Sequence, residues 1–380
     1  MIMRSPRAWI RAALLLSSLL SIPAAFAGGS PRRVSGPHDG NCYNPILSPD
    51  GSRVAYEVNF FERRVIEQYV YDLTTGKEQQ IQPSKGGSAI LNNFGMTGGG
   101  RQVTYELAWS PARSKVFVFA SSGGDENYDL YLSNGGVLAG DPAADGMATW
   151  SKDGQLIAFT SSRTGEGDLY LVDINNVESK PVQLTRFVDS TEWYPTWSPE
   201  GRRLLFVRHH SKGGDNLYLI NDVGSGNANI VPLTDWPSVQ TKPSWSPDGK
   251  RIAFFSNRRT KDRYDVYVMD AAANATPHII MENVIPNDRF GPTWAPDGKG
   301  VLVVKDDPER FNPIRLVNIA DPTRVKILGT GTQNNTDTHL ITNASGQILL
   351  GFTAQGRLGD SVKSFKKVYV YNLDASELSF

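Results

Sequence analysis

Short runs of β-branched and aromatic residues recur along the chain, and each follows a tight-turn sequence. In the clearest copy, Trp-Ser-Pro-Asp-Gly at residues 245–249 leads into Ile-Ala-Phe-Phe at 252–255. Proline presets φ at the second turn position, aspartate tolerates the third, and glycine accepts the strained exit. Hydrophobic runs on both sides of such a turn indicate a β-hairpin.

The same unit is repeated at a regular spacing. Its tryptophan, or the residue in its place, stands at positions 47, 109, 150, 197, 245, 294 and 342, which gives steps of 62, 41, 47, 48, 49 and 48 residues. Third strands are predicted at residues 129–131, 168–170, 216–218 and 265–267, and fourth strands at stretches such as 182–185 and 230–234. Repeats of about 40–50 residues with several strands each are typical of β-propellers.

We therefore predict an all-β fold, a β-propeller of four-stranded antiparallel blades. Seven motif copies favour seven blades, and six blades, with one copy serving to close the ring, is the alternative. Five of the eight tryptophans occupy one repeat position. Stacked blades need the same packing residue in every unit, whereas a ligand site does not, so we expect these indoles to be buried between blades.

The repeat resembles the TolB-type β-propeller family, and more loosely the propeller domains of prolyl oligopeptidases. The resemblance rests on the pattern Pro-x-Trp-Ser-Pro-Asp-Gly, then Ile-Ala-Phe and Asp-Leu-Tyr, and it covers nearly all of residues 43–380. It implies a propeller fold and, by analogy with periplasmic TolB of the Tol-Pal system, a binding role among envelope proteins. TolB has a small α/β domain before its propeller, and this sequence has no space for one.

The first 27 residues have the features of a signal peptide. Arg4, Arg7 and Arg11 precede and flank a short apolar run, which ends at the Ala-Phe-Ala of residues 25–27. We expect cleavage after Ala27 and a periplasmic or secreted protein. Residues 28–42 are predicted to be a flexible segment whose residues 32–35 could add a ring-closing strand, and residues 43–380 a single propeller domain.

Composition narrows the classes of partner. The chain has 39 Lys plus Arg and 39 Asp plus Glu, and this neutral balance argues against nucleic acid. Its single cysteine, Cys42, excludes an intrachain disulfide. No later run is long and apolar enough to span a membrane. We expect a monomer without cofactor or metal, because the sequence has no metal-ligand, P-loop or EF-hand motif.

Variable loops on a regular scaffold are where binding residues usually lie. If the strand that carries the tryptophan is innermost, the loops that enter it bring polar and aromatic residues to the channel mouth. Exposed aromatic rings beside charges suit peptide or sugar binding. The candidate residues of this set are Asp145, Glu192, Trp193, Tyr194, Lys242, Arg289, Phe290, Asp337 and His339.

A second candidate surface comes from the loops between the second and third strands of two consecutive units, residues 208–212 and 257–263. These loops should form one basic patch, which favours an acidic partner. Its residues are Arg208, His210, Lys212, Arg258, Arg259, Lys261 and Arg263.

Two functions fit these observations. The first is a non-catalytic, exported binding scaffold for envelope proteins or an anionic ligand. The second is a glycan-active enzyme similar to polysaccharide lyases with propeller folds, with its site at the channel mouth. Only five histidines are present, and His209, His210 and His278 fall outside the expected channel, which disfavours a three-histidine metal site. A Gly-x-Ser-x-Gly hydrolase elbow is also missing from the sequence.

Overall fold

The structure, a computed structural model, describes residues 29–63, 65–83, 89–90, 104–113, 115–122, 128–139, 141–176, 180–210, 213–225, 229–307, 309, 311–358 and 364–380. Residues 1–28, which include the predicted signal peptide, lie outside this part. The described chain is built from β-strands and one short 3-10 helix, η2 (Ala375–Leu378). The predicted all-β fold is confirmed.

The strands pair in sequence order into antiparallel sheets. The first sheet contains β2 (Asn41–Leu47), β3 (Arg53–Phe60), β4 (Val65–Asp72) and β5 (Glu78–Gln80). The second contains β8 (Thr104–Trp109), β9 (Phe117–Ser122), β10 (Tyr128–Leu132) and β11 (Val137–Ala139). A separate pair, β6 (Gln82–Pro83) and β7 (Ala89–Ile90), lies between them in sequence.

The next two sheets repeat this order. They consist of β12 (Asp145–Trp150), β13 (Leu156–Ser161), β14 (Asp168–Asp173) and β15 (Val182–Gln183), then β16 (Ser190–Trp197), β17 (Leu204–His210), β18 (Asp215–Asn221) and β19 (Asn229–Pro232). The following eight strands form one sheet because β23 also pairs with β25. They are β20 (Gln240–Trp245), β21 (Arg251–Thr260), β22 (Arg263–Asp270), β23 (His278–Ile285), β24 (Thr293–Trp294), β25 (Gly300–Lys305), β26 (Ile314–Asn318) and β27 (Val325–Ile327).

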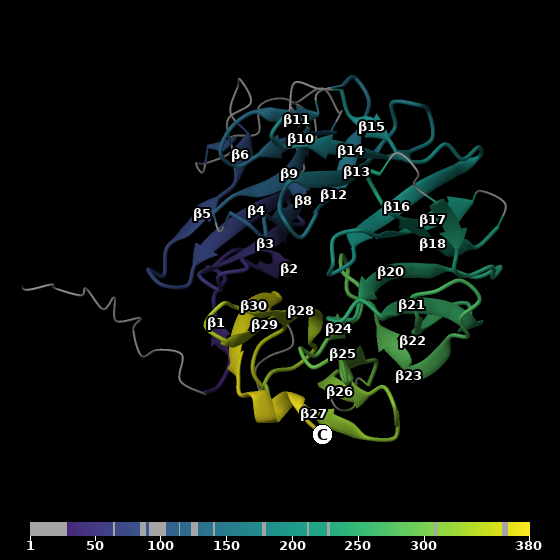
Figure 1. Cartoon of the computed structure of the whole chain (residues 1–380). Helices are drawn as coiled ribbons and strands as arrows, with labels where there is room; N and C mark the ends of the chain where they lie inside the picture. The colour runs from purple at the N-terminus through teal and green to yellow at the C-terminus, as the bar shows by residue number, and fades with distance from the viewer. Residues whose placement is uncertain are drawn as a thin grey trace, which may run out of the picture.

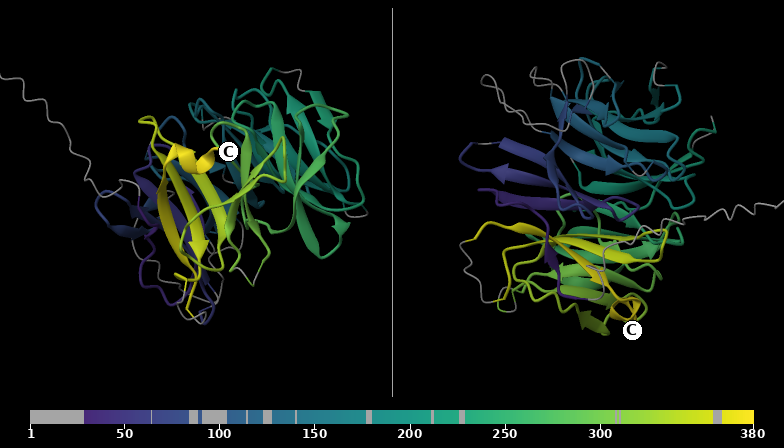
Figure 2. Two further views of the ribbon diagram at one scale, coloured as in Figure 1. Left: turned by 90° about the horizontal axis from the view of Figure 1, so that it is seen from below. Right: turned by 90° about the vertical axis from the view of Figure 1, so that its left-hand side faces the viewer.

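The last sheet joins the two ends of the described chain. It contains β28 (Thr336–Thr342), β29 (Ile348–Ala354) and β30 (Lys367–Leu373), and its outer strand is β1 (Arg32–Arg33) from the N-terminal side. The purple β1 lies against the yellow β30 in Figure 1, with Arg32 opposite Val370. The sheets follow one another around a centre in that view, and they are stacked face to face when seen from the side (Figure 2). Division of the eight-stranded sheet at the β23–β25 pairing gives the units that the motif spacing predicts; the number of blades stays a prediction.

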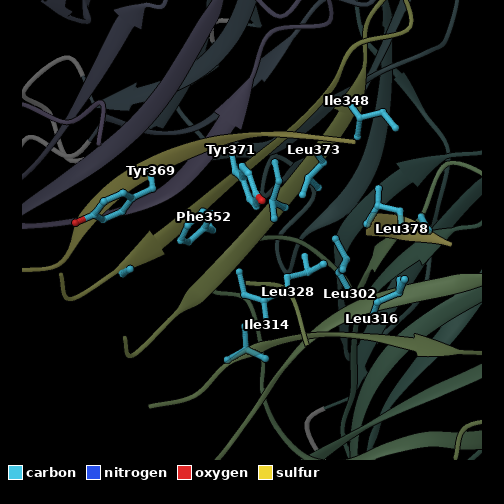
Figure 3. Close-up of a cluster of buried hydrophobic side chains, with 14 residues drawn as sticks. Leu302, Ile314, Leu316, Leu328, Ile348, Phe352, Tyr369, Tyr371, Leu373 and Leu378 are labelled. Atoms are coloured by element: carbon cyan, nitrogen blue, oxygen red, sulfur yellow. The ribbon is translucent and has the colours of Figure 1, made fainter. Parts of the chain in front are cut away.

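The core lies between neighbouring sheets. In one cluster, side chains of β29 and β30 such as Phe352 and Tyr371 face Leu302 and Leu316 of β25 and β26, and Leu378 of η2 covers the end of the cluster (Figure 3). At about 25 cal/mol per Å² of apolar surface, such buried faces supply the main driving force for stacking the units.

The repeated turn is held by its own side chains. Ser246 Oγ donates to Asp248 Oδ1 at 2.6 Å and accepts from the Arg251 backbone N–H at 2.9 Å, while Gly249 has φ +68°. Equivalent serine–aspartate bonds form at residues 48–50 and 151–153. The turn aspartate and glycine are therefore structural, as the sequence predicts.

The five tryptophans of the repeat form a ladder. Each is only 7–8% exposed, and each indole Nε1 donates to a carbonyl oxygen of the preceding unit. The acceptor is always the residue just before the motif position, and the pairs are Trp109–Ile46, Trp150–Ala108, Trp197–Thr149, Trp245–Thr196 and Trp294–Ser244 at 3.0–3.3 Å. The predicted packing role is confirmed, and the polar end of each ring is also satisfied.

Candidate functional site

The first strands of the units line a central channel with two adjoining hollows. One, of about 410 Å³, lies toward the loops that enter these strands, and its walls include Met147, Tyr194 and Lys242. The other, of about 500 Å³, lies toward the Ser-Pro-Asp-Gly turns, and its walls include Lys152 and Pro199. Phe290 and His339 line both hollows, so their rings lie where the two meet.

A bulge recurs at the same place in most of these strands, and three of the residues that it re-aims, Met147, Tyr194 and Lys242, line the first hollow. The strand pairing shifts register there, and residue three before the motif position adopts a left-handed backbone. These residues are Asn44, Met147, Tyr194 and Lys242, with φ between 50° and 53°. Such φ values are costly for residues other than glycine, and bulges commonly re-aim a side chain beside a functional site.

Lys242 places an ammonium group in the wall of the first hollow. Its Nζ donates to the Asn287 carbonyl at 2.7 Å and lies 6.0 Å from the centre of the Tyr194 ring. Burial lowers the pKa of Lys242, and the nearby carboxylates of Asp288 and Asp337 oppose that shift. The group is therefore a cation with few protein contacts, in a site where water is partly excluded.

Asp337 is close enough to Lys242 to affect its pKa, but it does not line the first hollow. It is 5% exposed, its Oδ1 accepts from the Asp288 N–H at 2.9 Å, and its Oδ2 accepts from Thr336 Oγ1 at 2.8 Å. Burial raises the pKa of Asp337, and the charge of Asp288 raises it further. The carboxyl groups of Asp288 and Asp337 thus lie near the Lys242 ammonium group.

His339 is a neutral side chain in this structure. Its Nδ1 accepts a hydrogen bond from the Leu47 N–H at 3.2 Å, and its ring centre lies 5.3 Å from that of Phe290. Burial and, to a smaller extent, the charge of Arg289 lower the pKa of His339 to about 4. Because Leu47 holds the place that tryptophan occupies in other units, His339 joins the last and first units where the ladder is interrupted.

Arg289 connects the channel mouth to the first sheet. Its Nη1 lies 3.5 Å from Glu57 Oε1, while Glu57 Oε2 accepts from Asn44 Nδ2 at 2.8 Å. Gln68 Nε2 contacts the same carboxylate at 3.4 Å. Asn44, Glu57 and Asp288 were not among the residues expected at the channel mouth. Asn44 stands three residues before its motif position, as Tyr194 and Lys242 do, and this spacing could have identified it.

Three residues expected at the mouth lie elsewhere. Asp145 is 1% exposed and accepts two hydrogen bonds from Arg163 Nη2 at 3.0 Å, and burial raises its pKa to about 6. Glu192 is fully buried and accepts from Ser190 Oγ and Thr185 Oγ1, and burial raises its pKa to about 7. Both stand two residues before the bulge position, and neither lines the first hollow. Glu192 instead reaches Thr185, which belongs to the preceding unit.

Trp193 also points away from the first hollow. Its ring stacks on His209 at 4.6 Å with an 8° interplanar angle, and it packs against the core that contains Trp245. His209 Nδ1 contacts Asp215 Oδ1 at 2.7 Å. Trp193 is therefore a packing residue beneath the loops.

The expected basic loop at residues 257–263 is a hairpin. Strand β21 ends at Thr260 and strand β22 begins at Arg263. Where their regular pairing is interrupted, the Asn257 side chain accepts from the Val239 N–H and donates to the Lys261 carbonyl. Arg259 is neutralised by Glu282 and Asp265. Lys261 and Arg263 are exposed on this hairpin, and Lys212 lies outside the described residues.

A further hollow lies apart from the channel. Arg208 and His210 line this pocket of about 420 Å³ together with Tyr218, Asp235 and Trp236. Arg258 does not line it, but lies 4.0 Å above the ring of Trp236 in its wall. The structure thus brings Arg208 and His210 of the predicted basic set to one pocket.

The described part of the chain has neither a metal-binding cluster nor a membrane-spanning helix. No group of three or more His, Cys, Asp or Glu residues there is arranged to hold a metal ion. None of its helices is long and apolar enough to cross a membrane.

Comparison with curated proteins gives a relative for part of the chain. An uncharacterized protein of Agrobacterium fabrum, Atu1656, is 28% identical over 161 residues, which is 39% of this chain and 50% of that protein. The chain thus spans about half the length of this relative.

Among solved structures, TolB from Acinetobacter baumannii is 17% identical with a TM-score of 0.49, and the match covers 77% of this chain and 65% of that one. An oligogalacturonate lyase in complex with manganese is 16% identical with a TM-score of 0.58, over 93% of this chain and 96% of that one. The latter likeness supports the propeller fold. The sequence model of the TolB beta propeller domain matches residues 40–209 and 183–356, and the chain belongs to that family.

Proposed function

We propose that this protein is an exported, non-catalytic binding scaffold of the cell envelope, and that a segment of a partner protein binds at its channel mouth. The observation that carries the proposal is the set of bulge residues in the first strands. One backbone position, fixed by the repeat, bears a different side chain in successive units, including Met147, Tyr194 and Lys242. A rigid frame with varied side chains around one opening suits selective recognition.

The chemistry of the opening favours a polypeptide segment with both apolar and charged groups. The wall of the hollow combines the rings of Tyr194 and Phe290 with Lys242 and Arg289, and the carboxylates of Asp288 and Asp337 lie beside it. Aromatic rings give contact area at a small entropic cost, and paired charges fix orientation. Export rests on the signal-peptide pattern of residues 1–27.

The test uses two lysines in opposite hollows. The mature chain, its Lys242→Ala variant and its Lys152→Ala variant would be used to capture proteins from envelope extract, with quantitative mass spectrometry of what is retained. We expect one or more proteins that the parent and Lys152→Ala retain equally and that Lys242→Ala loses. If both variants retain the same proteins as the parent, the channel mouth is not the binding site.

The alternative, a glycan-active enzyme, would use the same opening. The likeness to an oligogalacturonate lyase shows the fold alone, and no contact in the described residues singles out a reacting group. The purified chain should therefore leave acidic oligosaccharides uncleaved. Cleavage that is lost in both Asp337→Asn and His339→Ala would favour the enzyme over the scaffold.

A further inference from the structure

The pocket that Arg208 and His210 line is a second candidate site, separate from the channel. It is formed by β17, by β18, and by the segment between β19 and β20. The chain passes very close to itself there, since a Cβ added at Gly214 would overlap the carbonyl oxygens of Trp236 and Ser238. An isolated bridge from Asp215 to Val239 holds the two segments together. The pocket is therefore built into the fold.

Arg208 lines this pocket and Arg258 stacks on its wall, and neither guanidinium has an acidic partner among the described residues. Arg208 lies 4.1 Å above the Phe187 ring, and its Nε donates to Ser190 Oγ at 3.0 Å. Arg258 lies over Trp236, and its guanidinium has no hydrogen bond in the described part of the chain. Neither is within 4 Å of a described carboxylate, although the exposed Asp235 stands on the rim.

Other arginines of the same molecule, in contrast to Arg208 and Arg258, have acidic partners. Arg163, Arg203 and Arg259 each contact an aspartate or glutamate. In a chain with no net charge, acidic partners are not scarce. Planar guanidinium groups held by stacking keep their in-plane N–H groups available, which is the geometry that recognises carboxylate and phosphate oxygens.

We propose that this pocket binds a small organic anion, whose carboxylate or phosphate group is held by Arg208 and attracted by the charge of Arg258 beside the Trp236 wall. The volume of about 420 Å³ fits a ligand of one or two sugar rings or a short peptide end. Tyr218 and Trp236 supply aromatic surface for the body of the ligand. This site is distinct from the channel mouth, so the two can be tested independently.

The experiment follows the indole N–H signals of the purified mature chain by NMR. The signal of Trp236 is assigned from its loss in Trp236→Phe, and the ladder tryptophans report on the fold. The probes are glucuronate, inorganic phosphate and, as the neutral match, glucose. We expect glucuronate or phosphate to shift the Trp236 signal at millimolar concentration, while glucose leaves it unchanged and the ladder signals stay in place. A shift with phosphate identifies the oxyanion alone as sufficient, and a shift with glucuronate only means that the organic body is also needed.

Arg208→Gln and Arg259→Gln are matched variants, because each removes one guanidinium charge, the first from the pocket wall and the second from outside it. Arg208→Gln should weaken binding of the effective anion by about tenfold or more, the size of a lost charge-assisted hydrogen bond. Arg259→Gln, which breaks an existing ion pair with Glu282, should leave the affinity unchanged. Equal weakening by both variants, binding of glucose as tight as that of glucuronate, or no shift with either anion would each overturn the proposal.

Discussion

The indole Nε1 of Trp245 donates a hydrogen bond to the carbonyl oxygen of Thr196 in the preceding unit, 3.1 Å away. Thr196 is the residue just before Trp197, whose own indole bonds to Thr149 one unit earlier. The bond therefore joins neighbouring units at a repeated position, beside the bulges that aim Tyr194 and Lys242 into the channel. The ladder fixes the frame on which the variable side chains stand.

Removing one rung should destabilise the protein in two separable steps. Trp245→Phe keeps most of the ring but leaves the Thr196 carbonyl without its donor, which should cost about 1–3 kcal/mol. Trp245→Ala also opens a cavity and should cost about 3–5 kcal/mol in total. Urea titration of the free energy of unfolding measures both. Equal, near-zero effects of the two variants would mean that the ladder does not hold the units together.

The left-handed backbone at Lys242 predicts a conflict between stability and binding. Lys242→Gly removes the backbone strain, with φ of 50°, and the cost of burying the ammonium group, so it should raise the free energy of unfolding by roughly 1 kcal/mol. Lys242→Ala removes the ammonium group but keeps the strain. Denaturant titration should therefore place Lys242→Gly above Lys242→Ala in stability. The reverse order would show that the backbone there is unstrained.

Glu192 predicts a pH dependence with a definite sign. Burial raises its pKa from 4.5 to about 7, so the folded protein holds a proton that the unfolded chain releases above pH 4.5. Glu192 therefore makes the folded state less stable as pH rises from about 4.5 to 7. Glu192→Gln removes this effect, and its stability relative to the parent should grow by about 1–3 kcal/mol over that range. A difference that stays constant with pH would mean that Glu192 is charged in the folded protein.

The N-terminal segment should depend on Glu78. One oxygen of this carboxylate accepts from the Gly36 N–H at 2.9 Å, and the other lies 3.0 Å from His38 Nε2. Glu78→Ala should speed hydrogen exchange at the amides of Val34 and Cys42, which bond to Val368 and Lys366. Exchange in the sheet of β16–β19, far along the chain, serves as the control. Unchanged protection at both amides would show that backbone pairing alone holds the segment.

The regular part of the fold could be predicted from the sequence because its signals are local and repeated. The turn of residues 246–249 needs proline, aspartate and glycine at fixed positions, and the buried place of Trp245 follows from its recurrence. The pairing of β1 with β30 could be suggested from the sequence but not established, because a strand of two residues has no distinctive local pattern.

The site was less predictable because its contacts join distant residues. Arg289 meets Glu57, and His339 meets the Leu47 backbone, across sequence separations that no periodic pattern encodes. Asp145 and Glu192 were expected at the mouth because they precede the motif closely. They stand two residues before the bulge, and the bulge has no signature in residue type, since its position bears side chains as different as Met147 and Lys242.

The most direct test of the channel-mouth proposal is photo-crosslinking in intact cells. A photoreactive phenylalanine analogue would replace Tyr194 in the wall of the first hollow or, as the matched control, Lys152 in the wall of the second. We predict a discrete crosslinked protein partner from position 194, none from position 152, and loss of the adduct when Lys242→Ala is added. Adducts of equal yield from both positions, or from position 152 alone, would contradict the account.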